Sequence, residues 1–457
     1  MFDLAKVAGI TNGIILVVEI LILFGFTIFV HELGHFIAAK RMGVKVEKFS
    51  IGFGPKVFSF TRNGTEYIIS FFAFLGGYVK MAGEAPEEAE TAGNEGFLNQ
   101  PIWKKMLISV SGVVQNAVFA VLLMWIVMMA GTEVMKPTVE QVIKGGPAYE
   151  AGVKSGDDIV NINGKKIVQW NQISDTLAEA KGNSVSVTVL REGKEIVLTI
   201  KPEMMEREDI LKEKKLRPTL GIIAMQYLPV VESVKEGSPL QAAGVKKGDR
   251  IVEIGGKKIV IWDDIGMAVE ASAGKPVKMI VARGTETKII EITPHRETME
   301  DKDKKKRETF TIGIVPRINT IIEKYGPITA IGKAFQMTWY YTELTGRSLY
   351  KMVIRKIEPD VAGPIGVVQI AYKVAEIGFV PLLLFIAIIN INLVIFNLLP
   401  LLPFDGGMLL LFLIEGVTGK KVPLKVQQVM MEIGWGMLIL LIVFVTYSDI
   451  MRMVRGG

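Results

Sequence analysis

The 457-residue sequence contains no cysteine and only three histidines, at positions 31, 35 and 295. The absence of cysteine excludes disulfide bonds and thiolate metal ligands, and it leaves the cellular compartment open. No Gly-x4-Gly-Lys-Ser/Thr stretch is present, so we expect no ATP-driven activity of the P-loop type. The net charge of +6 is spread over several loops, so the sequence gives no indication of a nucleic-acid partner.

Long hydrophobic runs, in contrast, are abundant. Half of the residues are hydrophobic and the mean hydropathy is +0.37, which is unusual for a soluble protein. A helix that crosses a bilayer needs about 20 apolar residues. Four segments meet this requirement: 13–39, 106–131, 379–402 and 426–447. The first is too long and too polar at its end for a cleaved signal peptide. The sequence therefore predicts a polytopic α-helical membrane protein with four transmembrane helices.

Basic residues in short loops indicate the orientation of such a protein, because they stay on the cytoplasmic side. Three clusters flank the spans: Lys40, Arg41, Lys45 and Lys48; Lys104 and Lys105; and Lys420, Lys421 and Lys425. We therefore expect these loops in the cytoplasm. The long segment between the second and third spans is then outside, as are both termini.

The first span ends in the sequence His31-Glu32-Leu33-Gly34-His35. Residues four apart share one face of a helix, so the two imidazoles can bind one tetrahedral zinc ion. Glu32 then lies close enough to a water molecule on the metal to act as general base. The alternative is a pair of structural histidines at a membrane interface, but the spacing favours zinc. The third histidine, His295, follows a predicted strand and is expected to be a surface residue.

A catalytic zinc needs a third protein ligand, and the apolar stretch at 379–413 offers one. As one helix it would be roughly 52 Å long against about 30 Å of hydrocarbon, so it must break. The segment 397–407 contains two prolines and Asp405. An ionisable residue in such an apolar segment is usually functional, and a metal would compensate its charge. We predict that Asp405 is the third ligand; helix capping is the alternative.

Residues 44–82 are rich in aromatic and β-branched residues, and Asn63-Gly64 between two apolar runs is a strong hairpin signal. So many apolar side chains favour a membrane-associated β-sheet over an exposed cytoplasmic one. Its free edge is a candidate acceptor for a substrate strand. The acidic stretch 83–95 is expected to be a surface loop. In the second span, Asn116 is equally compatible with packing and with function.

The segment between the second and third spans contains an internal repeat. Residues 147–170 and 239–262 align without gaps, and 16 of the 24 positions are identical. Each copy has a short helix, a Gly-Asp pair, a strand and a glycine turn. The pattern resembles PDZ domains of the bacterial protease type, which bind extended peptides by strand addition. Peptide binding and exclusion by size are equally compatible with the sequence.

These observations give a predicted order of segments along the chain. The order is a first transmembrane helix with the histidine motif (1–43), a membrane-associated β-hairpin region (44–82), a cytoplasmic loop (83–104), a second transmembrane helix (105–131), two PDZ-like α+β domains (137–203 and 219–296), amphipathic interfacial helices (319–366), a third, broken transmembrane helix (379–416) and a fourth transmembrane helix (426–449).

The histidine motif, the segment from Asn397 through Pro400 to Asp405-Gly406, and the PDZ-like repeats together resemble the site-2 family of intramembrane zinc metalloproteases, and within it the RseP branch. The stretches 49–54 and 76–80 match the family pattern as well, so the resemblance covers nearly the whole chain. The chain departs from the pattern at Gly112-Val-Val-Gln-Asn116, Pro403, Phe404 and Met408. None of these departures removes a predicted ligand.

The resemblance implies zinc-dependent hydrolysis of a peptide bond within a transmembrane helix, with Asn397 near the substrate backbone. It implies substrates of the anti-sigma-factor type, trimmed by an earlier cut outside the membrane, and remnant signal peptides. The PDZ tandem would exclude untrimmed proteins, and the enzyme would act in a stress response at the bacterial inner membrane. The alternatives are a catalytically silent membrane PDZ scaffold and a zinc protease that degrades misfolded proteins; a transporter is disfavoured by the single charged site.

Overall fold

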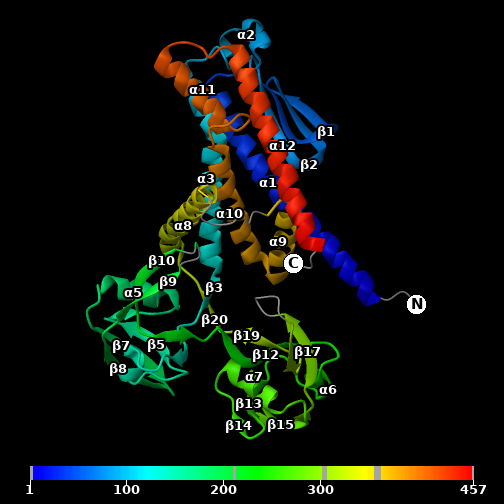
Figure 1. Cartoon of the computed structure of the whole chain (residues 1–457). Coiled ribbons are helices and arrows are strands. Elements are labelled where there is room, and N and C mark those ends of the chain that lie inside the picture. Colours follow the sequence, from blue (N-terminus) through cyan, green and yellow to red (C-terminus); the bar gives the residue numbers. More distant parts are fainter. Residues whose placement is uncertain (1–3, 209–210, 212, 301–305, 355–361, 455–457) are drawn as a thin grey trace. The chain divides into compact units, whose positions relative to one another are not determined.

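The computed structural model describes residues 4–208, 211, 213–300, 306–354 and 362–454. It divides into two compact units (Figure 1). The first unit is built from the chain up to Thr132 and again from Lys324 onwards, and the second is built from Glu133–Glu323. The second unit is therefore an insertion between two parts of the first.

The first unit is mainly helical. Its helices are α1 (Leu4–Arg41), α2 (Pro86–Ala92), the short 3₁₀ helix η1 (Gly93–Glu95), α3 (Ile102–Ala130), α8 (Pro327–Val353), α9 (Pro364–Ile377), α10 (Phe379–Asn397), α11 (Asp405–Thr418) and α12 (Leu424–Val454). Within the described chain, four helical segments are long and apolar enough to cross a membrane: Leu21–Arg41 of α1, and the whole of α3, α10 and α12. This confirms the predicted polytopic fold class.

Two apolar clusters hold the first unit together. One joins α3, α8 and α10, where the small side chains of Ala330 and Ala334 on α8 are fully buried against residues such as Met124 and Ile386. The other cluster joins α1, the β-sheet formed by residues 44–82, α3 and α11 through residues such as Val46 and Ile108. The opposite face of α8 leaves large apolar side chains exposed: Ile328, Ile331, Phe335 and Trp339.

The apolar stretch after residue 379 is interrupted between α10 and α11. A Cβ atom built on Gly407 would lie 2.5 Å from the carbonyl carbon of Leu401, and one on Gly406 would overlap the Leu398 carbonyl. Glycine is required at both positions, because any side chain would clash with the backbone of the turn. This tight reversal places Asp405 at the first position of α11.

Residues 44–82 form a sheet from β1 (Val46–Arg62) and β2 (Thr65–Met81), joined at Asn63-Gly64. Both strands bend at glycines with positive φ, such as Gly54 and Gly76. As a result, segment 46–51 pairs with 77–81 on one side and with 66–69 on the other. Segment 77–81 is thus an edge of the sheet. Beyond the bends, several large apolar side chains are exposed: Val57, Phe58, Phe60, Phe71 and Phe72.

The expectation of a surface loop at 83–95 is wrong in part, because the segment contains α2 and η1. Proline is well tolerated in the first turn of a helix, and the residues after Pro86 are mainly glutamate and alanine, which favour helix formation.

In the part of the chain that the structure describes, the second unit and the strand β3 at its start comprise four helices and eighteen strands. They are β3 (Thr132–Met135), β4 (Val139–Val142), α4 (Pro147–Glu150), β5 (Asp158–Ile162), β6 (Lys165–Lys166), α5 (Asn171–Glu179), β7 (Val185–Arg191), β8 (Lys194–Ile200), β9 (Glu203–Glu208), β10 (Lys214–Thr219), β11 (Ile222–Ala224), β12 (Tyr227–Val234), α6 (Pro239–Ala242), β13 (Arg250–Ile254), β14 (Lys257–Lys258), α7 (Trp262–Ala271), β15 (Val277–Arg283), β16 (Glu286–Ile292), β17 (His295–Glu300), β18 (Lys306–Thr311), β19 (Ile314–Ile318) and β20 (Thr320–Glu323).

Each sequence repeat has its own apolar core, and both cores extend beyond the predicted domain boundaries. Leu220 and Ile222 belong to the first core, because β11 returns to pair with β4. Ile312 belongs to the second core, where β19 pairs with β12. The predicted domain 137–203 therefore omits β11, which follows the β9–β10 hairpin. The predicted domain 219–296 omits β19, which follows the β17–β18 hairpin. His295 opens β17 and is exposed.

The two repeats share a buried aspartate that is held by an arginine. Asp249 is fully buried, and its two carboxylate oxygens each lie 2.7 Å from a nitrogen of Arg283. Asp157 is likewise fully buried and accepts two hydrogen bonds from Arg191, at 2.7 and 2.8 Å. In both repeats the arginine also donates to a glycine carbonyl at the end of the short helix. The pair therefore ties the glycine turn to the central sheet.

This pair makes the second repeat sensitive to acid. The hydrogen bonds from Arg283 hold the pKa of Asp249 below its usual value. A carboxyl group with a lowered folded-state pKa stabilises the fold above the unfolded pKa of about 3.9 and loses this effect as the pH falls further. Asp249→Asn should speed amide hydrogen exchange in the second repeat by about 10- to 100-fold at pH 7. Asp157→Asn should act on the first repeat alone; an equal effect of either variant on both repeats would contradict the assignment.

Candidate metal centre

The three predicted metal ligands converge on one point. His31 and His35 lie one turn apart on α1, and their Nε2 atoms are 3.2 Å apart. Asp405 Oδ2, from the start of α11, lies 3.2 Å from Nε2 of His31 and 3.4 Å from Nε2 of His35. Within the described chain, these residues form a group of metal-ligating side chains whose ligand atoms all lie within 4.8 Å of one another.

The geometry fits a tetrahedral zinc ion. Zinc binds imidazole nitrogen and carboxylate oxygen at about 2.0–2.2 Å, so two of its ligand atoms lie about 3.3–3.6 Å apart. The three observed separations, 3.2 to 3.4 Å, match this edge length. Asp405 Oδ2 is also buried and forms no hydrogen bond within the described chain. A buried oxygen without a donor is costly, and a bound cation would satisfy it.

Both histidines are oriented through their other ring nitrogen. His35 Nδ1 lies 2.9 Å from the carbonyl oxygen of Ile108 on α3, so Nδ1 carries the proton and Nε2 is free to bind a metal. His31 Nδ1 lies 3.3 Å from Nδ2 of Asn116, whose Oδ1 is buried and forms no hydrogen bond in the described structure. If the Asn116 amide is turned over, Oδ1 accepts the His31 Nδ1 proton and both imidazoles present Nε2 to the metal.

Gly112 allows α3 to approach the two imidazoles. A Cβ atom at this position would lie 2.7 Å from Cε1 and 2.8 Å from Nε2 of His31, and it would overlap Nε2 of His35. Gly34 lies on α1 between the two histidines, and a Cβ atom on it would lie 2.5 Å from the carbonyl oxygen of Ser111 on α3. The absence of side chains at these two glycines therefore lets the helices cross at the metal centre.

The ligands form one wall of a cavity of about 320 Å³. All five residues predicted for the site line it: His31, Glu32, His35, Asn397 and Asp405. Glu32 lies beside the edge of the sheet: a Cβ on Gly77 would be 3.2 Å from Glu32 Cγ, and the Val79 backbone hydrogen-bonds to the Glu32 carboxylate. The structure thus brings together the five polar residues that the sequence predicted for the site.

Other residues of the cavity were not identified from the sequence. They are Tyr78, Val79 and Met81 of the sheet edge, Glu84 and Phe97 of the following segment, Ile108 and Ser109 of α3, and Pro403, Phe404 and Met408 beside Asp405. Burial raises the pKa of Glu84, which accepts a hydrogen bond of 3.2 Å from the backbone nitrogen of Met81. Glu84 was expected in a surface loop; no local pattern distinguishes it from its acidic neighbours.

The comparisons with known proteins agree with this geometry. The model of "Peptidase family M50" matches residues 19–441. The chain belongs to this peptidase family. It is 32% identical over 449 residues to the "Regulator of sigma E protease" of Salmonella typhi, covering 95% of this chain and 98% of the relative. It is 32% identical to the "Regulator of sigma-E protease RseP" of Escherichia coli, covering 94% and 97%.

Two further similarities concern the metal and the repeats. A "Putative zinc metalloprotease" of Vibrio cholerae is 31% identical over 457 residues, covering 95% of this chain and 98% of the relative. A solved PDZ domain of an SdrC-like protein from Listeria monocytogenes is 27% identical, with a TM-score of 0.16, and covers 19% of this chain and 84% of that one. The M50 chain is a membrane metalloprotease of the site-2 type, which confirms the predicted enzyme class.

Proposed function

We propose that this M50 protein binds one zinc ion through His31, His35 and Asp405 and cleaves a peptide bond within the transmembrane helix of a single-span substrate. The observation that carries the proposal is the spacing of the three ligand atoms, which matches a tetrahedral zinc site on the wall of a cavity that also holds Glu32. Glu32 is the general base.

The chemistry divides between the metal and the chain. Zinc, when bound, supplies the Lewis acidity that activates a water molecule and polarises the scissile carbonyl. Glu32 takes a proton from the attacking water and later gives it to the leaving nitrogen. Asn116 and the Ile108 carbonyl orient the two imidazoles through their Nδ1 atoms. Asn397, the last residue of α10, lines the cavity. Its proposed role is to hydrogen-bond the substrate backbone.

The sheet edge is the candidate binding surface for the substrate. A helix hides its carbonyl groups in backbone hydrogen bonds, so the scissile segment must be extended before attack. Segment 77–81 pairs with 46–51 on one side only, and Tyr78, Val79 and Met81 line the metal cavity. An extended substrate strand added to this edge would run past the ligands, with main-chain hydrogen bonds to hold it.

The basic residues support an orientation with the metal centre toward the cytoplasm of a bacterial inner membrane. Lys104 Nζ at the start of α3 lies 2.9 Å from the carbonyl oxygen of Met42, just beyond α1. Lys105 and Lys421 border one cavity, so the loop between α11 and α12 lies at this same end of the first unit. The three clusters thus lie at one end, as the positive-inside rule requires of cytoplasmic loops.

The relatives named as regulators of sigma E favour a substrate of the anti-sigma-factor type. The family resemblance adds that this substrate is trimmed by an earlier cut and that remnant signal peptides are a second substrate class. The second unit, inserted between α3 and α8, would gate access to the membrane site by size. A variant lacking residues 133–323, the whole of the second unit, should then cleave untrimmed single-span proteins that the full chain rejects.

Metal analysis combined with a cleavage assay tests the proposal. The purified wild type should contain about one zinc per chain and cleave a tagged single-span peptide, truncated on its outer side, at a bond within the span. Removal of zinc by a chelator should stop cleavage, and added zinc should restore it. Cleavage of soluble loops alone would indicate a general protease instead, and a protein without zinc would favour the silent scaffold.

Asp405→Asn tests the third ligand. An amide is a weaker zinc ligand than a carboxylate and brings no charge, so we expect zinc affinity to fall by more than about 100-fold, measured by competition with a chelator. The exposed His295 provides the control, because His295→Ala should leave the zinc content unchanged. Unchanged zinc affinity in Asp405→Asn would remove Asp405 from the site.

A further inference from the structure

Asp405 reaches the metal centre from a helix that packs along α3. On α11, Asp405, Met408, Phe412 and Glu415 recur every three or four residues and therefore share one face. On α3, the same spacing places Lys105, Ile108, Gly112 and Asn116 on one face. The two helices pack against each other, and their polar residues cluster at the two ends of the contact. One end is the metal centre.

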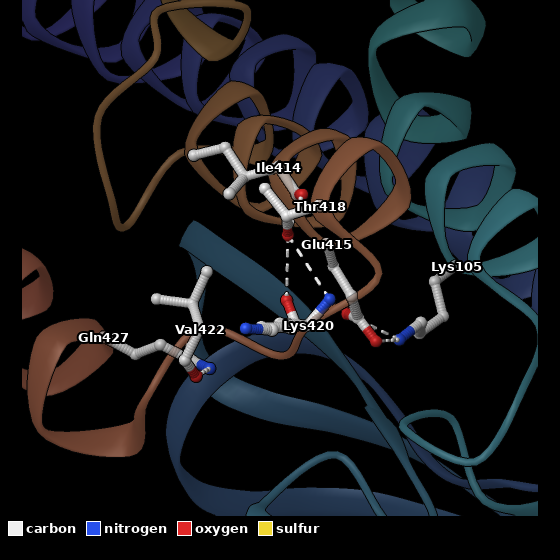
Figure 2. Close-up of polar contacts among 7 residues, drawn as sticks. All are labelled: Lys105, Ile414, Glu415, Thr418, Lys420, Val422 and Gln427. Carbon is white, nitrogen blue, oxygen red and sulfur yellow. Dashed lines mark hydrogen bonds and ion pairs between the residues drawn. The ribbon is translucent and has the colours of Figure 1, made fainter.

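The other end is an ion pair that the proposed mechanism does not use. Lys105 Nζ lies 3.1 Å from Oε2 and 3.3 Å from Oε1 of Glu415 (Figure 2). Lys105 Nζ also lies 4.8 Å from the ring centroid of Phe412. The Lys105 side chain is only 3% exposed and that of Glu415 is 16% exposed. Such a pair pays a desolvation cost, so burial alone does not explain why it is present between α3 and α11.

We propose that the Lys105–Glu415 pair fixes the position of α11 along α3 and thereby holds Asp405 at the distance that the metal requires. The inference rests on the proposed zinc function. Lys105 and Glu415 are positioning residues, since neither lines the metal cavity and each acts through the helix that carries it.

The other contacts of α11 hold this position along α3 less firmly. Apolar contacts such as those of Met408 are non-directional, and the edge-to-face contact of Phe412 is with Phe97, which precedes α3. A cavity of about 350 Å³ borders Leu411, Phe412 and Glu415, so the second half of α11 lacks close packing on that side. The glycines at the start of α11 hold it only against the preceding turn of the same chain.

A small displacement of α11 would reach the metal directly. A helix transmits axial movement over the roughly 15 Å from Glu415 to Asp405 because its backbone hydrogen bonds make it stiff. Metal–ligand distances tolerate only about ±0.2 Å. Loss of the ion pair should therefore weaken zinc binding even though both residues lie outside the site.

The test compares the zinc affinity of the full chain and its variants by chelator competition. Lys105→Met and Glu415→Gln should each bind zinc about 10- to 100-fold more weakly than the wild type, the range known for groups that orient metal ligands. The double variant Lys105→Glu with Glu415→Lys restores an ion pair and should recover affinity to within a few-fold of the wild type.

Asp449→Asn provides the matched control. Asp449 is a buried carboxylate of α12 that accepts hydrogen bonds from the backbone nitrogens of Gly363, at 3.0 Å, and Gly366, at 2.8 Å. Replacing this carboxylate also disturbs a buried charged contact between helices, but that contact joins α12 to the start of α9 and does not involve α11. Thermal unfolding should shift in the same direction as in Lys105→Met, while the zinc affinity stays at the wild-type value.

A disulfide provides the decisive rescue, because the chain has no cysteine of its own. A Cβ on Gly416 would lie 3.6 Å from Cγ2 of Ile102, close enough for Ile102→Cys with Gly416→Cys to cross-link α3 and α11. Oxidation of this pair in the Lys105→Met background should restore zinc affinity, and reduction should remove it again.

The outcomes distinguish the positioning role of the Lys105–Glu415 pair from the proposed zinc function. A wild type with one zinc ion and variants that bind it equally well would overturn the positioning role alone. Weak binding in Lys105→Met that neither the charge reversal nor the disulfide restores would overturn it too. A wild type that binds no zinc would instead overturn the proposed function.

Discussion

Replacing Glu32 with glutamine is expected to abolish cleavage of the single-span peptide while the protein keeps its zinc. The amide fills the same space as the carboxylate but cannot accept a proton from the attacking water, so kcat should fall by about 10²- to 10⁴-fold. None of the three ligand atoms belongs to Glu32, so zinc content and affinity should match those of the wild type. Single-turnover cleavage and metal analysis of the same preparation measure both quantities.

Glu84→Gln is the matched control for this experiment. Glu84 is the other glutamate that lines the metal cavity, so the same chemical change is made within the same space. We expect its activity to remain within about tenfold of the wild type, because the role of base belongs to Glu32. Normal turnover by Glu32→Gln, or a loss confined to Glu84→Gln, would refute the assignment of the base.

The second large effect is expected at a residue without a side chain. Gly112→Ala should lower both zinc affinity and cleavage by about 100-fold or more, because the added methyl group would occupy the space of the His31 and His35 imidazoles. The ligands would have to move by a substantial part of an ångström, which exceeds what zinc coordination tolerates. Zinc competition and peptide cleavage on the purified variant measure the effect.

Gly436→Ala separates this steric effect from the general consequence of changing a glycine in a membrane helix. A Cβ on Gly436, in α12, would meet no atom within 4 Å. Alanine favours helix formation over glycine, so this variant should be at least as stable as the wild type and fully active. Full zinc binding by Gly112→Ala would show that α3 can move away from α1 at little cost.

Local sequence patterns were sufficient for the elements whose signals lie within one segment. The four apolar helices follow from their length, and the His31–His35 pair follows from helical spacing. The turn at Asn63-Gly64 follows from the dipeptide itself. Asp405 was identifiable because a charge in an apolar stretch needs compensation. Each of these inferences uses only neighbours in the chain.

Local sequence patterns could not predict the strands β11 and β19, which complete the two repeats, or the full lining of the metal cavity. β11 and β19 complete the two repeats after intervening hairpins, so sequence repetition alone placed the domain boundaries too early. Glu84 and Tyr78 enter the metal cavity because the sheet edge lies beside α1, which no local pattern records. Local sequence does not distinguish Gly112 from any other glycine in a helix, so its contact with the two imidazoles could not be predicted.

The sequence by itself determined the class of this protein, its transmembrane helices and the candidate metal ligands, because periodicity and residue type are local properties. Only the tertiary structure decided that Asp405 meets His31 and His35 at tetrahedral distances, that Gly112 and Asn116 face them, and that Lys105 pairs with Glu415 at the far end of α11. Distances between helices depend on how their side chains pack in three dimensions, and a metal site is defined by those distances.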